Sequence, residues 1–242
     1  MSLKFTKYIF LFIIAAIFCR CAQVAPLTGG KRDFTPPKVL KSIPENATLN
    51  FNSSVIEITF DEFVQLKDIS NNVVITPQPK NFPTIEASGK KITITFKEKL
   101  NPNTTYRLFF GKAIADMHES NVLANYEYVF STGNFIDSLK ISGQVVNALS
   151  LKGEADVLVG LYSIVTSDSA IYLNKPDYLT KTNESGQYTL RYLPKNTFEI
   201  VAFTDKNKNL LFDSGEEWIG FIDKQVSTEK DSLVNLSILK KI

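Results

Sequence analysis

The sequence predicts an all-β protein, with two tandem β-sandwiches behind an N-terminal signal and a flexible tether. Apolar and polar residues alternate over many short segments, turn-forming residues separate these segments, and no long stretch shows a helical apolar period. Because successive side chains of a strand point to opposite faces, each segment offers one apolar face to a core. Several short strands with turns between them are typical of β-sandwiches.

The N-terminus has the pattern of a secretion signal. Lys4 and Lys7 precede an apolar run over residues 8–18, which has about half of the roughly 20 apolar residues that a membrane-spanning helix needs. Cys21 follows shortly after. A cysteine in this place indicates a bacterial lipoprotein, in which residues 1–20 are the removed signal peptide and Cys21 is acylated on its sulfur. The alternatives are an ordinary signal peptide cut nearby and an uncleaved N-terminal anchor.

The composition limits the classes of function. The chain of 242 residues has a formal charge of +2, and removal of residues 1–20, which hold three cations and no acid, leaves −1. This balance argues against nucleic acid as a partner. Both cysteines lie near the N-terminus, so the remaining sequence has neither a disulfide nor a thiol nucleophile. Its stability must come from burial of a core, which the 44% hydrophobic content and 18 Phe make plausible.

A tether and a first β-domain follow the signal. Residues 21–34 contain Gly29-Gly30 and no apolar period, which predicts a flexible lipidated tether. The first domain is predicted over residues 35–133, with turn residues such as Pro44-Glu45-Asn46 between its strands. Its alternating apolar positions are Ile56, Ile58 and Phe60; Ile92, Ile94 and Phe96; Tyr106, Leu108 and Phe110; and Tyr126, Tyr128 and Phe130.

The first domain resembles the bacterial Ig-like module first described in S-layer proteins. The shared marks are a Pro-Pro entry at 36–37, a P-E-N turn at 44–46, the strand end I-E-I-T-F-D at 56–61, and a closing Y-V-F-S-T-G at 128–133. The tether resembles a tract of Bacteroidota outer-membrane lipoproteins. The matching positions are Cys21-Ala22, Pro26, Gly29-Gly30, Asp33 and Pro36-Pro37. This second resemblance implies a fatty-acyl anchor such as palmitate on Cys21 and a place at the outer membrane.

A second β-domain is predicted over residues 139–242. It opens with Ile141, Gly143 and Val145 and closes with Leu233, Leu236 and Ile238. The tracts I-S-G-x-V-x-N-A, T-N-E-S-G-Q-Y-T-L-R-Y-L-P and F-E-I-V-A-F-x-D resemble the prealbumin-like sandwich that accompanies carboxypeptidases, a structural module in many unrelated proteins. This resemblance implies a tight hairpin at Glu184-Ser185-Gly186. Lipoproteins of this kind usually carry a longer C-terminal part, so a truncated chain and a short member of the group are both open.

One loop has the ligand spacing of a calcium site. Oxygen-bearing side chains occupy loop positions 1, 3, 5, 9 and 12, and a main-chain carbonyl is available at position 7, as in a 12-residue calcium loop. These ligands are Asp205, Asn207, Asn209, Leu211 (carbonyl), Asp213 and Glu216. Leu210 stands at position 6, where such loops usually have Gly, and the flanks are predicted strands, so the loop is not an EF-hand. We expect a structural calcium ion; the alternative is a solvated Asn/Asp turn.

Other polar residues give weaker patterns. Asp61-Glu62 and Asp116 with Glu119 could be imagined as a glycosidase pair, but a polar strand end and a surface loop explain them better. His118, the one histidine, has no nucleophile motif beside it. Three Asp-Ser-apolar triplets match the O-glycosylation pattern that the Bacteroidota resemblance implies. Their acceptors would be Ser138, Ser169 and Ser232.

These features together predict a lipid-anchored, non-enzymatic cell-envelope protein. We expect it to act as a structural or accessory binding subunit of an outer-membrane protein complex, with an outer-membrane protein as its partner. The alternative is a surface glycan-binding or adhesion lipoprotein, in which exposed aromatic rings stack on sugars. The candidate rings are Tyr162, Tyr172, Tyr178 and Trp218. Two or three of them on one open face would favour the glycan hypothesis.

Overall fold

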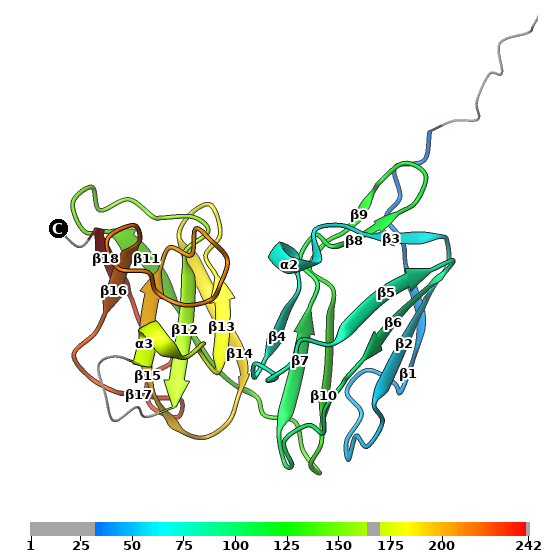
Figure 1. Cartoon of the computed structure of the whole chain (residues 1–242), viewed down its shortest axis with the longest axis horizontal. Helices are drawn as coiled ribbons and strands as arrows, with labels where there is room; N and C mark the ends of the chain where they lie inside the picture. Colours follow the sequence, from blue (N-terminus) through cyan, green and yellow to red (C-terminus); the bar gives the residue numbers. More distant parts are fainter. Residues whose placement is uncertain (1–31, 164–169, 241–242) are drawn as a thin grey trace, which may run out of the picture. The chain divides into compact units, whose positions relative to one another are not determined.

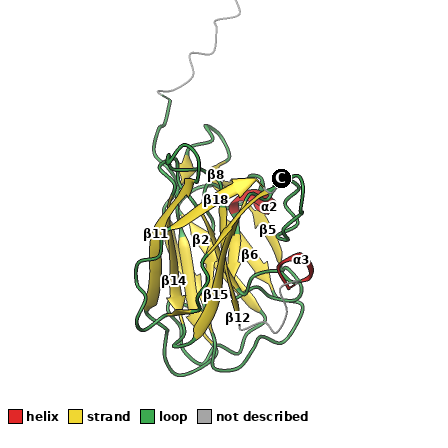
Figure 2. Ribbon diagram, turned by 90° about the vertical axis from the view of Figure 1, so that its left-hand side faces the viewer, coloured by secondary structure: helices red, strands yellow, loops and turns green. Residues whose placement is uncertain are grey.

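The computed structural model describes residues 32–163 and 170–240, and these residues are almost entirely strands and loops (Figure 1). Its two helices, α2 (Ile69–Asn72) and α3 (Ala170–Leu173), are single turns (Figure 2). The all-β prediction is therefore confirmed. The strands of the first sandwich are β1 (Val39–Ile43), β2 (Val55–Phe60), β3 (Val64–Leu66), β4 (Val74–Thr76), β5 (Thr84–Ser88), β6 (Lys91–Thr95), β7 (Thr105–Phe109), β8 (Ile114–Asp116), β9 (Val122–Leu123) and β10 (Glu127–Ser131).

Two sheets of the first sandwich enclose its core. One has the strand order β1-β2-β6-β5 and the other β10-β7-β4, with a small β3-β8-β9 sheet beside them. Ile56 is opposite Ile94 across β2 and β6, and Leu108 is opposite Tyr128 across β7 and β10. All four side chains are fully buried or nearly so in one apolar cluster. The alternation predicted for these strands is confirmed, since eleven of its twelve apolar positions are buried in this cluster and Tyr126 packs against it.

The P-E-N turn has a definite structural role. The side chain of Asn46 accepts a hydrogen bond from the main-chain N–H of Val129 (2.8 Å) and donates one to the carbonyl of Glu127 (3.2 Å), so it acts like an extra strand residue beside β10. The buried hydroxyl of Tyr128 donates to the carbonyl of Pro44 at 2.8 Å. The turn is therefore fastened to β10, which explains why Pro, Asn and the aromatic strand occur together.

The second sandwich is built from β11–β18. Its strands are β11 (Leu139–Asn147), β12 (Leu158–Ser163), β13 (Tyr178–Lys181), β14 (Gln187–Leu193), β15 (Thr197–Phe203), β16 (Trp218–Phe221), β17 (Val226–Ser227) and β18 (Leu236–Lys240). They form one sheet in the order β13-β12-β15-β16-β18-β11-β14, and β17 pairs with β15. Residues from most of these strands share a single buried cluster on one face, so the sheet curls around its core.

The segment before β18 packs closely against Gly143 of β11. A Cβ built on Gly143 would lie 1.7 Å from the carbonyl oxygen of Val234, which is far inside van der Waals contact. The same oxygen accepts the hydroxyl of Tyr188 at 2.6 Å, and the Val234 N–H donates to the carbonyl of Ser142 at 2.8 Å. Only a glycine allows this approach. Leu233 was predicted to belong to the closing apolar segment with Leu236 and Ile238, and this is wrong, because it precedes β18 and is exposed.

A tight turn forms at Glu184-Ser185-Gly186, but the predicted hairpin is wrong, because β13 and β14 on its two sides pair with β12 and β11 and not with each other. Gly186 has φ +76, a conformation that residues with a Cβ rarely adopt. The side-chain oxygen of Asn183 accepts the N–H groups of Ser185 and Gln187, which closes the turn. The resemblance therefore placed a turn at the correct residues but implied the wrong strand pairing.

Candidate functional site

The predicted calcium loop connects β15 to β16. Its base is closed by two hydrogen bonds between Thr204 and Trp218, from the Thr204 N–H to the Trp218 carbonyl (3.0 Å) and from the Trp218 N–H to the Thr204 hydroxyl (2.9 Å). Inside the loop, the two carboxylate oxygens of Asp205 accept the N–H groups of Asn209 and Leu210, both at 3.1 Å. The loop is therefore folded around its first acidic side chain.

Four of the five side chains predicted as calcium ligands are linked in this loop. Asp213 accepts the side-chain amides of Asn207 (2.6 Å) and Asn209 (2.9 Å), and the Asn209 side-chain oxygen accepts the Leu211 N–H at 2.7 Å. Since the Asp205 carboxylate also accepts the Asn209 N–H, one hydrogen-bond network joins Asp205, Asn207, Asn209 and Asp213. Among the described residues, no group of three or more His, Cys, Asp or Glu side chains has the arrangement of a metal site.

The fifth predicted side chain, Glu216, does not join the network. It is exposed, whereas its neighbour Glu217 is only 1% exposed. Glu217 accepts the N–H of Lys206 at 2.8 Å and that of Asp213 at 3.0 Å, so it ties the first part of the loop to the last. The spacing rule selected Glu216, whereas the glutamate that is hydrogen-bonded within the loop is Glu217.

Leu210 takes the conformation that a calcium loop usually assigns to glycine. Its φ is +64, in the left-handed region. A leucine there is strained by roughly 1–3 kcal/mol, which the surrounding structure must offset. Leu210 packs as a partly buried residue against the buried side chains Phe203 and Phe212, and this burial is a stabilising contribution that a glycine would lack.

The second sandwich also has an apolar outer face. Strand residues that alternate with the core positions turn away from the core and form a second buried cluster. Its strand members are Leu158, Tyr162, Leu179, Val201 and Phe203. Helix α3 and the loop before β16 cover part of this face with Ile171 and Phe212. Two further apolar residues on it are not covered, because Phe221 of β16 is 67% exposed and Leu239 of β18 is 46% exposed.

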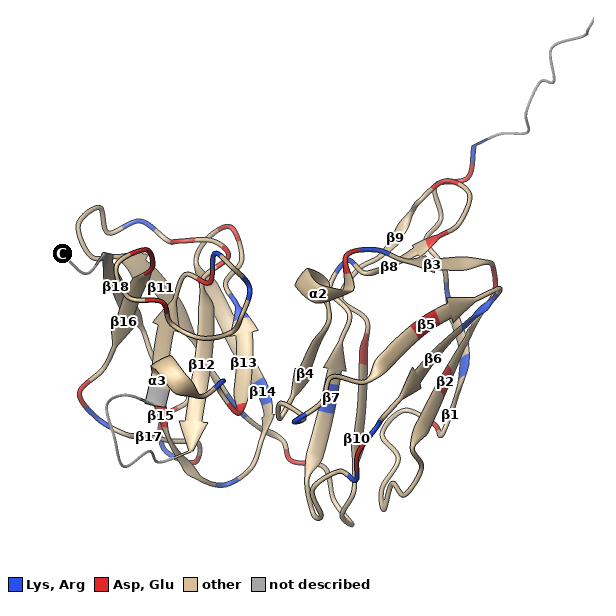
Figure 3. Cartoon of the chain, in the orientation of Figure 1, with Lys and Arg blue, Asp and Glu red and all other residues tan. Residues whose placement is uncertain are grey.

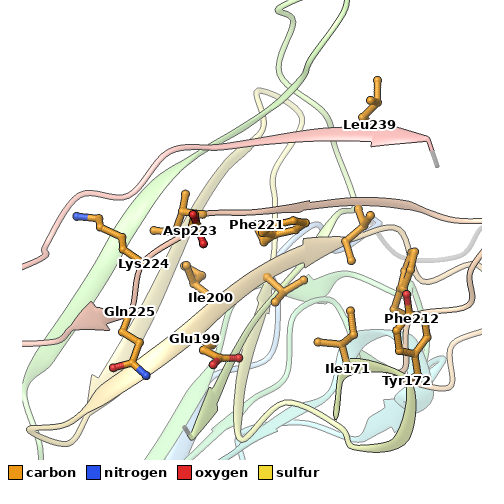
Figure 4. A pocket seen from close by; sticks show the side chains of 13 residues that line it. Ile171, Tyr172, Glu199, Ile200, Phe212, Phe221, Asp223, Lys224, Gln225 and Leu239 are labelled. Carbon is orange, nitrogen blue, oxygen red and sulfur yellow. The ribbon is translucent and has the colours of Figure 1, made fainter. Parts of the chain in front are cut away.

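A cavity of about 840 Å³ opens on this face, and we call it the outer groove. One end is apolar and the other is polar (Figure 4). The side chains at the apolar end include Ile171, Tyr172, Phe212, Phe221 and Leu239, and those at the polar end are Glu199, Asp223, Lys224 and Gln225. The volume lies in the range of about 300–1,000 Å³ that is usual for ligand sites.

The carboxylates considered for catalysis have structural partners. Asp116 is fully buried and accepts four main-chain N–H groups, from His118, Glu119, Ser120 and Asn121, at 2.6–3.0 Å. Burial opposes its ionisation, but the four hydrogen bonds prevail and hold the pKa of Asp116 below its ordinary value. Asp116 therefore shapes the loop between β8 and β9. The His118 ring meets the Phe63 ring edge-on, with 6.5 Å between the centroids.

The aromatic residues named for sugar stacking do not share an open face. Tyr162 is 2% and Tyr178 is 8% exposed, and Trp218 is partly buried against the core of the second sandwich. Tyr172 is at the surface and packs on Phe212, with the ring centroids 5.5 Å apart. The arrangement that would favour glycan binding is therefore not formed by these four side chains.

The predicted modification sites are only partly within the described structure. Ser138 and Ser232 are exposed, while Ser169 and Cys21 lie outside the described residues. Within residues 32–163 and 170–240, no helix has the length and apolar character needed to cross a membrane. Lys and Arg are distributed among Asp and Glu over both sandwiches (Figure 3).

Comparison with known proteins identifies the first sandwich. Residues 33–132 match the family described as bacterial Ig-like domain, so this part of the chain is an Ig-like module, as its motifs predicted. No curated protein matches the chain. The resemblance of the second sandwich to the prealbumin-like module stays a prediction.

Solved structures give distant likenesses. The N-terminal part of the bacterial S-layer protein SbsC is 14% identical, with 78% of this chain and 45% of that chain covered and a TM-score of 0.29. BcpA, the major pilin subunit of Bacillus cereus, is 11% identical (85% and 71% covered, TM-score 0.25). An L,D-transpeptidase from Mycobacterium smegmatis is 12% identical (69% and 76% covered, TM-score 0.27). The chain thus spans less than half of the S-layer fragment, and likenesses at these TM-scores carry no information about function.

Proposed function

We propose that this chain is a lipid-anchored, non-enzymatic protein of the bacterial cell envelope that acts as a structural or accessory binding subunit of an outer-membrane protein complex. The observation that supports it most is the bacterial Ig-like domain at residues 33–132, directly after a sequence with the features of a lipoprotein signal and tether. In such a protein Cys21 fixes the chain to the membrane, the tether sets its reach, and the sandwiches present the contact surfaces.

Acylation of Cys21 is the first part of the proposal that can be tested. Full-length protein would be expressed in a Gram-negative host fed an alkyne analogue of palmitate and then examined by intact-mass analysis. We expect label on the wild type and on Cys19→Ser, because Cys19 lies within the predicted signal, and no label on Cys21→Ser. A free thiol at Cys21 in the mature wild-type protein would contradict the lipid anchor.

The loop of residues 205–217 is proposed to bind calcium in a structural role. Its oxygens come from Asp205, Asn207, Asn209 and Asp213, and Glu217 takes the place first given to Glu216. A carboxylate has about four lone-pair sites, so accepting one or two N–H groups leaves others for a cation. Calcium prefers six to eight oxygen ligands, which the loop carbonyls and water would complete. Such an ion would hold together a long connection between β15 and β16.

A further inference from the structure

The outer groove combines three features that differ in chemistry. The first is its apolar wall. Phe221 and Leu239 are exposed at 67% and 46%, next to the buried side chains of Val201 and Phe212. The outer face of a sandwich is ordinarily solvated and polar, whereas this one continues as an apolar surface from the covered part to the open part. An apolar surface of this kind next to a cavity is typical of an interaction site.

The second feature is an excess of negative charge at the polar end. Among the described residues, neither Glu199 nor Asp223 has an ion-pair partner. The one cation that lines the groove, Lys224, pairs with Asp231, with 3.4 Å between its Nζ and the carboxylate. The polar end therefore has two carboxylates that a cation from outside could approach. An anionic ligand would be repelled there.

The third feature is a gap in the strand pairing of β15. Strand β17 pairs with β15 at Thr197 and Phe198, and β16 pairs with it from Val201 to Phe203. Between these stretches the chain leaves the ladder at residues 222–225, and Glu199 and Ile200 have no partner strand on that side within the described structure. The gap is two residues long and has a paired stretch on each side, so it offers one or two main-chain hydrogen-bonding groups rather than a free strand edge.

We propose that the outer groove binds an extended segment of a partner protein in which bulky apolar side chains stand next to a lysine or arginine. The apolar side chains would cover Phe221 and Leu239, and the cation would lie between Glu199 and Asp223. A fatty acid supplies the apolar part but brings a carboxylate to the acidic end. A peptide also supplies main-chain groups for the gap beside β15. That the partner is an envelope protein rests on the proposed function. The chemistry of the bound segment rests only on the residues of the groove.

The test selects peptides that bind the second sandwich, using the chain without its predicted signal and anchor cysteine, residues 22–242. A random dodecapeptide display library would be panned on the immobilised wild type, and enriched peptides would be synthesised with a fluorescent label and measured by polarisation. We expect enriched sequences with apolar residues beside Lys or Arg. Phe221→Ser combined with Leu239→Ser should weaken binding by about tenfold or more, since truncation of central apolar contacts typically costs at least the 1.4 kcal/mol that tenfold represents. The double substitution Glu199→Gln/Asp223→Asn should weaken the binding of the same peptides and make that binding less dependent on salt.

Matched controls separate the groove from general surface effects. Leu149→Ser removes a side chain that is 84% exposed in the same sandwich, and Glu184→Gln removes an exposed carboxylate; both should leave binding unchanged. Circular dichroism and thermal unfolding would show that each variant is folded. The side chains of Phe221 and Leu239 are exposed, so their substitution should leave the fold intact.

Several outcomes would overturn the proposal. They are the absence of any enriched peptide, enriched peptides that bind the Phe221→Ser/Leu239→Ser variant as well as the wild type, and acidic peptides that bind best. Two other occupants are tested in parallel. Saturation by dodecanoate that depends on Phe221 would assign the groove to acyl chains, and a concentration-dependent dimer in sedimentation that Phe221→Ser abolishes would assign it to a second copy. A Cys21 that is not acylated would contradict the lipid anchor and leave the peptide result standing.

Discussion

Substitution of Gly143 by alanine should strongly destabilise the second sandwich. The new Cβ would lie 1.7 Å from the Val234 carbonyl oxygen and 3.0 Å from the Tyr188 ring. The backbone at Val234 must therefore move by well over an ångström, because ordinary contacts between such atoms are about 3.5 Å. Strand β11 cannot give way easily, since Gly143 is paired with Tyr188 of β14 on its other side.

The magnitude follows from the contacts that this movement breaks. Three of the hydrogen bonds that hold the segment before β18 are made at Ser232 and Val234: Tyr188 hydroxyl to Val234 carbonyl, Val234 N–H to Ser142 carbonyl, and Ser142 N–H to Ser232 carbonyl. At about 1 kcal/mol each, their loss costs about 3 kcal/mol. Overpacking of a tight site costs about 1–3 kcal/mol more. We therefore expect the free energy of unfolding to fall by about 4–6 kcal/mol, which is a large share of the roughly 5–15 kcal/mol of a typical domain.

Urea unfolding monitored by tryptophan fluorescence measures the stability of the second sandwich. The chain has a single tryptophan, and Trp218 packs against the core of the second sandwich. With an m-value of about 1–3 kcal/mol per molar urea, the midpoint should fall by about 1.3 M or more. Lys140→Ala, an exposed position on the same strand, should leave the midpoint unchanged. If the Gly143→Ala midpoint stays within about 0.5 M of the wild type, the close approach of Val234 to β11 is wrong.

Three further predictions concern other sites. Asp116→Asn should destabilise the first sandwich by about 1.5–3 kcal/mol near neutral pH, because the neutral amide oxygen accepts the bonds to Oδ1 more weakly and the amide NH2 cannot accept the Asn121 N–H that bonds to Oδ2. In the wild type the folded pKa of Asp116 lies below its unfolded value, so its stabilising contribution is present above about pH 4 and is lost as the pH falls through the folded pKa. Calorimetry should detect calcium binding to the wild type. The Glu216→Gln variant should bind calcium equally well, and the Glu217→Gln variant should bind it more weakly. Tyr188→Phe should lower the free energy of unfolding by about 1 kcal/mol through loss of its bond to the Val234 carbonyl.

Each of these predictions has a measurement that would contradict it. For Asp116, hydrogen exchange over residues 116–121 should accelerate in the variant, and unchanged protection would show that the carboxylate does not hold the loop. For the calcium loop, a calorimetric titration of the wild type that shows no heat at millimolar calcium would contradict the proposed calcium site. For Tyr188, an unchanged urea midpoint together with a phenol pKa near 10 in a spectrophotometric titration would contradict its burial, which raises that pKa.

The regular core could be predicted because its period is simple. Ile56, Ile58 and Phe60 alternate with polar residues, and strand geometry then places all three side chains on one face. Strands such as β9 and β17, with two residues each, are too short for any period to show. They form because β8 and β15 offer main-chain hydrogen-bonding groups beside them. The apolar pattern of one short segment does not show such pairing.

The candidate sites could be predicted only where their chemistry is local. The loop network at Asp205, Asn207 and Asn209 was found because these residues are neighbours in sequence. Glu217 was missed because the choice between two adjacent glutamates depends on how the chain enters β16. The outer groove was missed for a different reason. Phe221 and Leu239 occur in segments whose neighbours fill the core, and the sequence alone does not show which face of a sheet stays uncovered.

Photo-crosslinking in intact cells tests the account most directly. A benzophenone amino acid would replace Phe221 in the full-length protein, and the matched control would carry it at Leu149, which is exposed in the same sandwich. We predict that Phe221 crosslinks to one discrete envelope protein, that the same crosslink weakens when Glu199 and Asp223 are neutralised, and that Leu149 gives none. Equal crosslinking from both positions, or none from Phe221 in correctly localised protein, would contradict the proposed role of this chain as a docked envelope subunit.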